Sequence, residues 1–569
     1  MTTVSQRPYT RVTLEEFAQE AQKMIAQIET ATSAQDVLQA RDRYVALVTR
    51  YQTAEALSNM RYTINTIDEF YLGEKDYYDE IGPQVQNWLL QYAKAMLNTP
   101  YRRELEESGQ IIPLVFRTFE VETKAISPAI LEDMVEENKA VSEYSRLMAG
   151  MEFAFRGETL PRSLLMKYAK SEDRATRKEA YEVLGNTLKA HAKELDDIFD
   201  RLVTIRDRMA KKMGYQNFVE LGYYRMGRLG YGPDEIRQFR DNVLTDWVPM
   251  VSRLRKENAA RLGLSDLKLY DLDIIIPGGD PEPKGGKEEI FQAAREMYHD
   301  MSADTGKFID FMLDTEAFDV GSRKNKWGGG YCTQFAQWKQ PFILANFNGT
   351  SGDVDVVTHE AGHAFASYMT ADNRFSAELD VGGMETAETH SMSMEFFAWK
   401  YIHKFFGENA KKYQFMHLMD AISFIPYGVI VDDFQRQVYE KPEMTPQQRK
   451  EIWLALEAKF RPYMSADGIP YLEEGARWQY QMHIFETPFY YIDYCLAQTA
   501  ALQFLIASQK DYPDAFSRYI RFLSQGGEKT FPELLEEAGL RSPFQEGALR
   551  EVARESEALL EHVAEEAGL

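Results

Sequence analysis

The chain has 569 residues, 44% of them hydrophobic, which is enough to bury a large core. Its 65 basic residues face 89 acidic ones, and this net charge of −24 excludes nucleic acid as a partner, since that recognition needs a basic surface. Cys332 and Cys495 are too few for a disulfide framework, so we expect reduced thiols whose role is packing rather than redox chemistry. Residues 1–8 lack an apolar signal core and no stretch reaches membrane-spanning length, which predicts a cytoplasmic protein without a membrane partner.

Long amphipathic helices are predicted from Leu14 to about Asp196, where glycine and proline are scarce. Ser33 followed by Asp36 resembles a capping box at the start of one of them. Further helices are predicted through residues 188–213 and 233–258, and the lack of an internal repeat disfavours a solenoid. We therefore expect a mainly α fold, with an N-terminal helical region at 1–196 and a second region at 197–569.

A small amount of β-structure is predicted in the second region. The Pro- and Gly-rich residues 276–286 read as an exposed loop, and strands are expected within Lys326 to Asn348. The glycine triplet that begins at Gly328 lacks the G-K-S/T ending of a phosphate-binding loop. A nucleotide site is therefore excluded there.

His359, Glu360 and His363 form an H-E-x-x-H motif in a helix-compatible stretch of a chain with nine histidines. Residues four apart share a helix face, so both imidazoles can bind one ion while Glu360 lies on the flank. The alternative is two surface histidines on an amphipathic helix, because the pattern arises by chance in roughly one per cent of such chains. A catalytic zinc ion would also need a third protein ligand.

A stripe of carboxylates follows the motif and supplies candidates for that ligand. Glu385, Glu388 and Glu395 lie along one side of a predicted helix, bordered by Met and Phe. Solvated helix-surface acids are the alternative interpretation. Any of the three could complete a metal site on this pattern alone.

A second cluster lies near the C-terminus, where His483, Tyr490, Tyr491 and Tyr494 fall within a dozen positions. Tyr491 and Tyr494 are three apart and therefore share a helix face, so that their phenols could reach one point. Aromatic residues at this spacing more often pack in a core, which is the alternative.

These motifs resemble one known family. H-E-A-G-H after D-V-D-V-V-T, followed by E-T-H-S-M-S-M-E, is similar to the thimet-oligopeptidase-type zinc peptidases, especially the oligoendopeptidase F and Pz-peptidase branch. The resemblance is strongest from about Arg174 to Phe544. It implies a helical molecule enclosing a deep channel, with a small β-sheet next to the metal-binding helix in a catalytic region at 197–569. The implied substrates are short unstructured oligopeptides cut internally, including collagen-derived peptides that contain Pro and Gly.

The resemblance also assigns roles to residues at the metal. A single zinc ion per chain would be held by His359, His363 and Glu388, with Glu385 as the alternative third ligand. Glu360 would act as general base. Asp355 and Glu395 are candidates to orient the imidazole ligands from behind.

Across the cleft, the family has a histidine and a Tyr-x-x-Tyr element that stabilise the transition state. These map to His483, Tyr491 and Tyr494, and Tyr490 is a further candidate because the His-to-Tyr spacing differs slightly here. Family members also carry a G-G-Y segment and a P-F-x-L-x-N-F strand, which favours a peptide-binding strand over an ordinary hairpin. The residues expected to contact substrate are Gly329, Gly330, Tyr331, Leu344 and Asn346.

Two other functions compete with an endopeptidase. A carboxypeptidase of the same architecture would need a basic group for the substrate's C-terminus, which Arg323, Lys324 or Lys326 could supply. An inactive peptide-binding helical protein would carry the motif by accident. The expected partners are short peptides, and the sequence does not indicate an oligomeric state.

Overall fold

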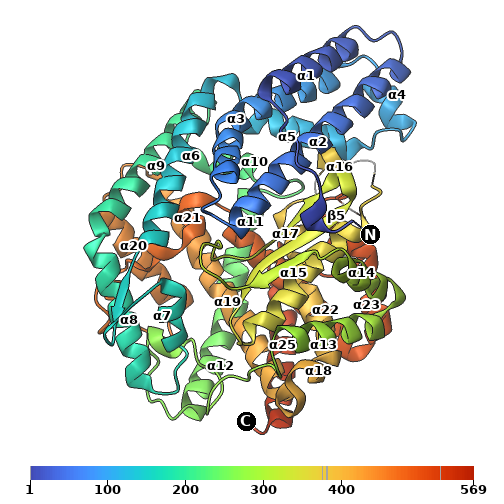
Figure 1. Cartoon of the computed structure of the whole chain (residues 1–569). Helices are drawn as coiled ribbons and strands as arrows, with labels where there is room; N and C mark the ends of the chain where they lie inside the picture. The colour runs from blue at the N-terminus through green and yellow to red at the C-terminus, as the bar shows by residue number, and fades with distance from the viewer. Residues whose placement is uncertain (1, 374–375, 380–381, 526) are drawn as a thin grey trace.

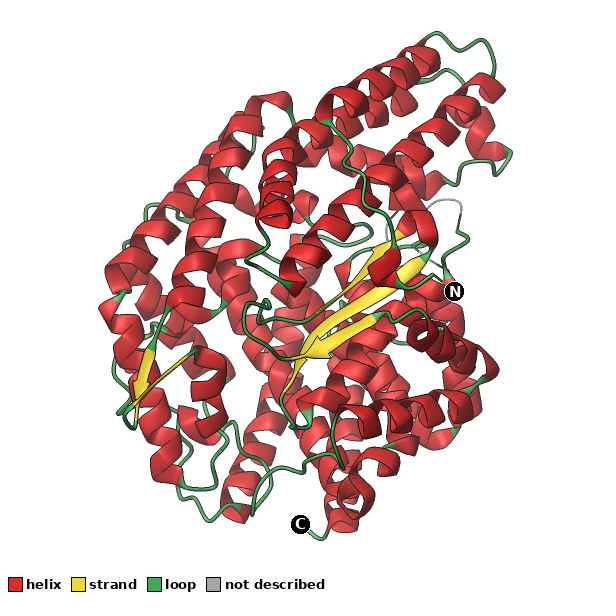
Figure 2. Cartoon of the chain, viewed as in Figure 1, coloured by secondary structure: helices red, strands yellow, loops and turns green. Residues whose placement is uncertain are grey.

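The computed structural model of the chain describes residues 2–373, 376–379, 382–525 and 527–569. Helices make up most of the molecule, and the only strands among the described residues form two small sheets (Figure 2). The predicted mainly α fold with a small sheet beside the metal-binding helix is therefore confirmed.

The N-terminal helices extend along one side of the molecule, from α1 and α4 at the top to α7 and α8 at the lower left (Figure 1). They are α1 (Leu14–Glu29), α2 (Ala34–Ile64), α3 (Glu69–Asn98), α4 (Arg102–Glu107), α5 (Pro113–Ala125), α6 (Leu131–Gly150), α7 (Arg162–Tyr168), α8 (Arg174–Ala190) and α9 (Ala192–Lys212). A short antiparallel hairpin of β1 (Phe153–Phe155) and β2 (Glu158–Leu160) separates α6 from α7.

The remaining helices belong to the second part of the chain, and α15 lies directly against the second sheet. They are α10 (Phe218–Arg225), α11 (Pro233–Asn242), α12 (Val248–Arg261), α13 (Lys287–Met301), α14 (Ala303–Asp314), α15 (Gly352–Met369), α16 (Ser376–Leu379), α17 (Met384–Phe397), α18 (His403–Phe406), α19 (Ala410–Glu440), α20 (Pro446–Phe460), α21 (Met482–Glu486), α22 (Tyr491–Lys510), α23 (Tyr512–Ser524), α24 (Phe531–Glu537) and α25 (Leu549–Ala567). The predicted loop at 276–286 connects a short 3-10 turn, η4 (Leu269–Asp271), to α13.

The first helices follow local rules that are readable in the sequence. Ser33 caps α2 through its side chain, which accepts from the N–H of Asp36 at 3.2 Å, so the predicted helix start is confirmed. On α1, the buried residues recur at helical spacing and form one apolar face: Phe17, Ala21, Met24 and Ile28. This face packs in a core that α1, α2, α3 and α5 share, separate from the main core of the molecule.

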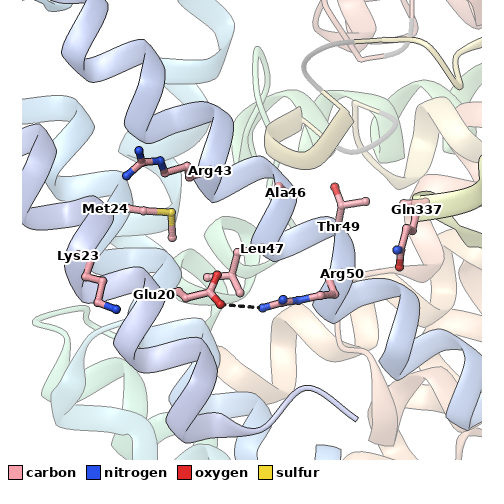
Figure 3. Close-up of a pocket in the computed structure, with 10 residues that line it drawn as sticks. Glu20, Lys23, Met24, Arg43, Ala46, Leu47, Thr49, Arg50 and Gln337 are labelled. Carbon is pink, nitrogen blue, oxygen red and sulfur yellow. Dashed lines mark hydrogen bonds and ion pairs between the residues drawn. The ribbon is translucent and has the colours of Figure 1, made fainter. Parts of the chain in front are cut away.

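A groove runs between the two outermost of these helices. Its cavity of about 570 Å³ lies between α1, α2 and a 3-10 turn, η5 (Ala336–Trp338) (Figure 3). Met24 and Leu47 lie at its base, with Lys23, Arg43 and Arg50 around it. None of its lining residues belongs to the motifs identified in the sequence.

The second sheet leads directly into the metal-motif helix. Its strands are β3 (Phe318–Gly321), β4 (Tyr331–Phe335) and β5 (Gln340–Phe347), in the order β3-β5-β4. β5 pairs parallel to β3 and antiparallel to β4, so β4 is an edge strand. Helix α15 follows β5 along the chain and contacts both β4 and β5.

One stretch among the described residues, His403–Glu440, has the length and hydropathy of a membrane-crossing helix, although none was expected from the sequence. Most of this stretch is α19. The structure buries 78% of its apolar window, and α19 contacts α20, α22 and α25. Its apolar character is therefore explained by its place at the centre of the main core.

Glu137 of α6 is buried between two arginines and should govern the acid stability of the scaffold. It accepts from Arg206 Nε at 2.7 Å and Arg225 Nη2 at 2.8 Å. Burial by itself would raise its pKa, but the two guanidinium groups lower it to about 2. Because the folded pKa lies below the unfolded one, this stabilisation is complete above about pH 4.5 and is lost as the pH falls toward 2.

We therefore expect Glu137→Gln to lower the melting temperature at pH 7. The free energy of unfolding should fall by at most about 3 kcal/mol. The difference from the unmodified protein should shrink below pH 4.5, which thermal unfolding monitored between pH 3 and 7 would measure. A difference that stays constant over this range would contradict the proposed ion-pair energetics.

Candidate active site

Helices α15 and α17 approach each other very closely at Gly362, inside the H-E-x-x-H motif. A Cβ at this position would lie 2.6 Å from Ser391 Cα and 2.9 Å from His390 O, so only glycine allows the contact. The close packing brings the histidines of α15 next to Glu388 on α17.

His359, His363 and Glu388 converge on one point. His359 Nε2 lies 3.4 Å from Glu388 Oε2, and His363 Nε2 lies 3.6 Å from the same oxygen. The ligand atoms of all three residues fall within 4.8 Å of one another. Two imidazoles and one carboxylate are the donor set of many catalytic zinc sites, so these residues fit the metal that the motif predicts.

Glu388 is buried and held from two sides. Ser391 Oγ donates to its Oε2 at 3.2 Å, and Tyr490 Oη donates to its Oε1 at 2.6 Å. Burial alone would raise the pKa of this carboxyl group, but His363 and His359 hold the pKa well below its usual range. Glu388 is therefore ionised, as a metal-binding carboxylate must be.

Glu395 orients His359 from behind. Its Oε1 accepts from His359 Nδ1 at 2.6 Å, and its Oε2 accepts from His417 Nε2 at 2.6 Å. His417 Nδ1 in turn accepts from the indole N–H of Trp399 at 2.9 Å, and because indole only donates, the proton of a neutral His417 is on Nε2. Because Nδ1 of His359 is hydrogen-bonded to Glu395, its Nε2 is left free to face Glu388.

The other predicted orienting residue has a different partner. Asp355 Oδ1 accepts from Tyr413 Oη at 2.6 Å, which ties α15 to α19. His417 and Trp399 were missed from the sequence, although His417 lies among Phe415, Met416, Leu418 and Met419, a setting typical of a buried histidine. Only the fold brings it to Glu395.

The three tyrosines divide between two sides. Tyr490 contacts Glu388 directly, and its ring centroid lies 4.8 Å from that of Tyr494. Tyr494 lies beside Tyr490 at the start of α22, and burial with the nearby carboxylates Glu388 and Glu360 raises its pKa. Tyr491 instead packs against Phe424 and Tyr427 of α19, at 5.6 and 5.8 Å between centroids. Tyr490 and its neighbour Tyr494 therefore lie nearest to the ligand carboxylate, and the role expected of Tyr491 stays a prediction.

His483 lies among these tyrosines, 5.0 to 5.8 Å from their ring centroids. Tyr427 Oη donates to Gln481 Oε1 at 2.7 Å, and Gln481 Nε2 then donates to His483 Nδ1 at 3.0 Å. Burial lowers the pKa of His483, so the imidazole is neutral and its remaining proton is on Nε2. Gln481 gave no signal in the sequence beyond its place two residues before His483.

The residues predicted to contact substrate have structural partners of their own. Tyr331 Oη shares a hydrogen bond with Thr63 Oγ1 at 2.7 Å, and Asn346 Nδ2 donates to the carbonyls of Trp327 and Gly329, both at 2.9 Å. The side chain of Leu344 is buried in the core. Gly330 lies against Leu344 O, where a Cβ would be at 3.4 Å. These contacts support the sheet, and substrate contact by these residues stays a prediction.

Two of the three basic residues considered for a carboxylate site are engaged elsewhere. Arg323 pairs with Asp319 through two nitrogens, each at 2.7 Å. The amino group of Lys326 is buried, and it donates to Asp319 Oδ1 at 2.8 Å and to the carbonyl of Gly321 at 3.1 Å. Both residues fix the end of β3.

Comparison with known proteins agrees with this geometry. Residues 4–126 match the peptidase M3 N-terminal domain, and residues 167–274 and 295–554 match peptidase family M3. A crystal structure of a protein provisionally described as oligoendopeptidase F superposes with a TM-score of 0.94 at 41% identity over 100% of both chains. Pz peptidase A with an inhibitor superposes with a TM-score of 0.94 at 40% identity over 98% of this chain and 99% of that one.

Curated relatives match over shorter stretches. Oligopeptidase PepF of Bacillus subtilis (strain 168) is 21% identical over 384 residues, which span 66% of this chain and 55% of that protein. The match to group B oligopeptidase PepB of Streptococcus agalactiae serotype III (strain NEM316) spans 33% of the relative. The family model covers more than half of the chain. The resemblance to the oligoendopeptidase F and Pz-peptidase branch is confirmed, and the chain belongs to peptidase family M3.

Proposed function

We propose that this protein is a zinc-dependent endopeptidase that hydrolyses internal bonds of short unstructured oligopeptides. The observation that carries the proposal is the convergence of His359, His363 and Glu388, with Tyr490 hydrogen-bonded to Glu388 and Tyr494 beside it. His483 supplies a neutral N–H donor within the same group of rings. A metal ligand set with hydrogen-bond donors close by is the arrangement that amide hydrolysis requires.

His359 Nε2, His363 Nε2 and Glu388 would hold the zinc ion, which when bound lowers the pKa of water to about 7 and polarises the scissile carbonyl. Glu360, adjacent to His359 but outside the ligand set, takes the proton of the attacking water and passes it to the leaving amine. Tyr494 Oη and His483 Nε2 donate to the carbonyl oxygen as it becomes negative. Tyr490 holds Glu388 in place through its hydrogen bond.

The substrate class follows from the sheet and from the relatives. β4 is an edge strand that contacts the metal-motif helix, and an extended peptide that added to it would bind through its main chain, whatever its sequence. The likeness to Pz peptidase A supports collagen-type peptides rich in Pro and Gly. We also propose a channel that admits only unfolded peptides. The free thiols Cys332 and Cys495 favour a cytoplasmic location.

The internal mode of cleavage is supported by the basic residues near the sheet. Arg323 and Lys326 already satisfy their hydrogen-bonding capacity within β3 and its loop, so a substrate carboxylate would have to displace buried or bidentate partners. Of the three basic residues considered, only Lys324 is then left to hold a substrate carboxylate, so we favour internal cleavage.

We expect C-terminal amidation of a peptide to leave its internal cleavage undiminished, because no step of the mechanism uses a free carboxylate. Mass spectrometry of the products from matched free-acid and amidated peptides, with and without a chelator, measures this. Cleavage should stop with the chelator and return with zinc. Cleavage confined to free-acid peptides would overturn endopeptidase action in favour of a carboxypeptidase.

A further inference from the structure

Phe489, directly before Tyr490, has an unusual backbone conformation. Its φ is +68°, in the left-handed region that a residue with a Cβ rarely occupies. Such a conformation persists only where the surroundings enforce it, and it is found most often at functional sites. Here it determines the direction in which the chain enters α22, and therefore the position of Tyr490 at the start of that helix.

The side chain and the N–H of Phe489 are both fixed. Its N–H donates to Gln435 Oε1 at 3.1 Å, and the amide of Gln435 is itself oriented because Nε2 donates to Val431 O at 3.0 Å. The Phe489 ring lies against Gly222, where a Cβ would be 2.6 Å from a ring carbon. Gln435 and the Phe489 ring are fully buried.

Arg228 holds the other end of this peptide unit. Its Nη2 donates to the carbonyl of Phe489 and also to Asp493 Oδ1, the latter at 2.7 Å. Phe489 precedes Tyr490 and Asp493 precedes Tyr494, so one nitrogen joins the two turns that carry these phenols. Arg228 and Asp493 each have a side chain that is 1% exposed, so no solvent competes for this contact.

We propose that Arg228, assisted by Gln435, is a positioning residue that sets the placement of Tyr490 and Tyr494 relative to Glu388. The inference rests on the proposed function, in which Tyr490 supports a metal ligand and Tyr494 stabilises the transition state. Without Arg228, the carbonyl of Phe489 loses its partner, and only Gln435 and the packing of the ring against Gly222 still restrain the left-handed conformation. The two phenols then move together, although Arg228 itself touches neither substrate nor metal.

Arg240 provides a matched control. It lies twelve residues further along the chain, its side chain is 7% exposed, and its Nη1 donates to buried Asp432 Oδ2 at 2.6 Å. Arg228→Lys and Arg240→Lys therefore perturb buried arginine–aspartate pairs of similar burial. Only Arg228 also holds the residue before Tyr490.

We expect Arg228→Lys to lower kcat by about tenfold or more while KM changes by less than about twofold, because misplaced transition-state donors cost turnover rather than binding. Arg240→Lys should leave kcat within about twofold, at a comparable loss of melting temperature. Equal kcat losses in the two variants would overturn the inference.

The same substitution in a background that lacks both phenolic hydroxyls separates positioning from general damage. In Tyr490→Phe/Tyr494→Phe, adding Arg228→Lys should change kcat by less than about twofold, since nothing is left to position. If Arg228→Lys lowered kcat equally in both backgrounds, the positioning role would be refuted, but the proposed function would not. Full activity of Tyr490→Phe/Tyr494→Phe by itself would instead refute the proposed roles of the phenols.

Gln435→Leu provides a second test of the proposal if Arg228→Lys does not fold. It removes the acceptor for the Phe489 N–H without changing any charge. We expect a fall in kcat with little change in KM, which disappears in the Tyr490→Phe/Tyr494→Phe background. Unchanged kcat in Gln435→Leu would count against the inference.

Discussion

Glu360→Gln is expected to lower kcat by about 10²- to 10⁴-fold while zinc stays bound, because an amide cannot take the proton of the attacking water. Glu360 lies beside His359 on α15 but is outside the converging set of His359, His363 and Glu388, so its replacement leaves the ligands in place. Hydrolysis of an internally quenched peptide measures kcat, and elemental analysis of the purified variant measures its metal content.

Glu388→Gln is the companion variant, because it removes a ligand charge and keeps the general base. It should lose both zinc and activity, whereas Glu360→Gln loses only activity. Full turnover in Glu360→Gln would contradict the assigned base. Peptide binding without hydrolysis by the unmodified, zinc-loaded protein would favour the inactive peptide-binding alternative.

Tyr494→Phe is expected to lower kcat by about 10²- to 10³-fold with little change in KM, as the loss of one oxyanion donor typically does. Burial and the nearby carboxylates Glu388 and Glu360 raise the pKa of Tyr494 above its ordinary value. The phenol therefore keeps its proton throughout the neutral and mildly alkaline range, and its donor role should not produce a fall in kcat below pH 10. Steady-state kinetics across this pH range test both statements.

Tyr491→Phe is a matched control for that variant. It removes a hydroxyl from the same helix, α22, but from a ring that packs against Phe424 and Tyr427. We expect kcat to stay within about threefold, because this hydroxyl is not one of the assigned transition-state donors. A loss for Tyr491→Phe as large as that for Tyr494→Phe would support the role that the sequence predicted for both tyrosines.

Much of the fold and part of the candidate site could be predicted because the information is local. The apolar spacing on α1 and the Ser33 cap of α2 depend on residues within one or two turns. His359 and His363 share a helix face for the same reason, with Glu360 between them in the chain. Glu388 needed the resemblance to a family, because its helix also offered Glu385 and Glu395 on the same side.

The sequence by itself determined the helical class, the metal-binding motif and the chemistry to expect from it. Tertiary structure alone decided that Glu395 reaches His359, while Asp355 is bound by Tyr413. It also brought Tyr490 to Glu388 and Arg228 to Phe489, which lies 261 residues further along the chain. The physical reason is that periodicity specifies which side of a helix is buried, whereas the partner of a buried polar atom depends on how distant helices pack together.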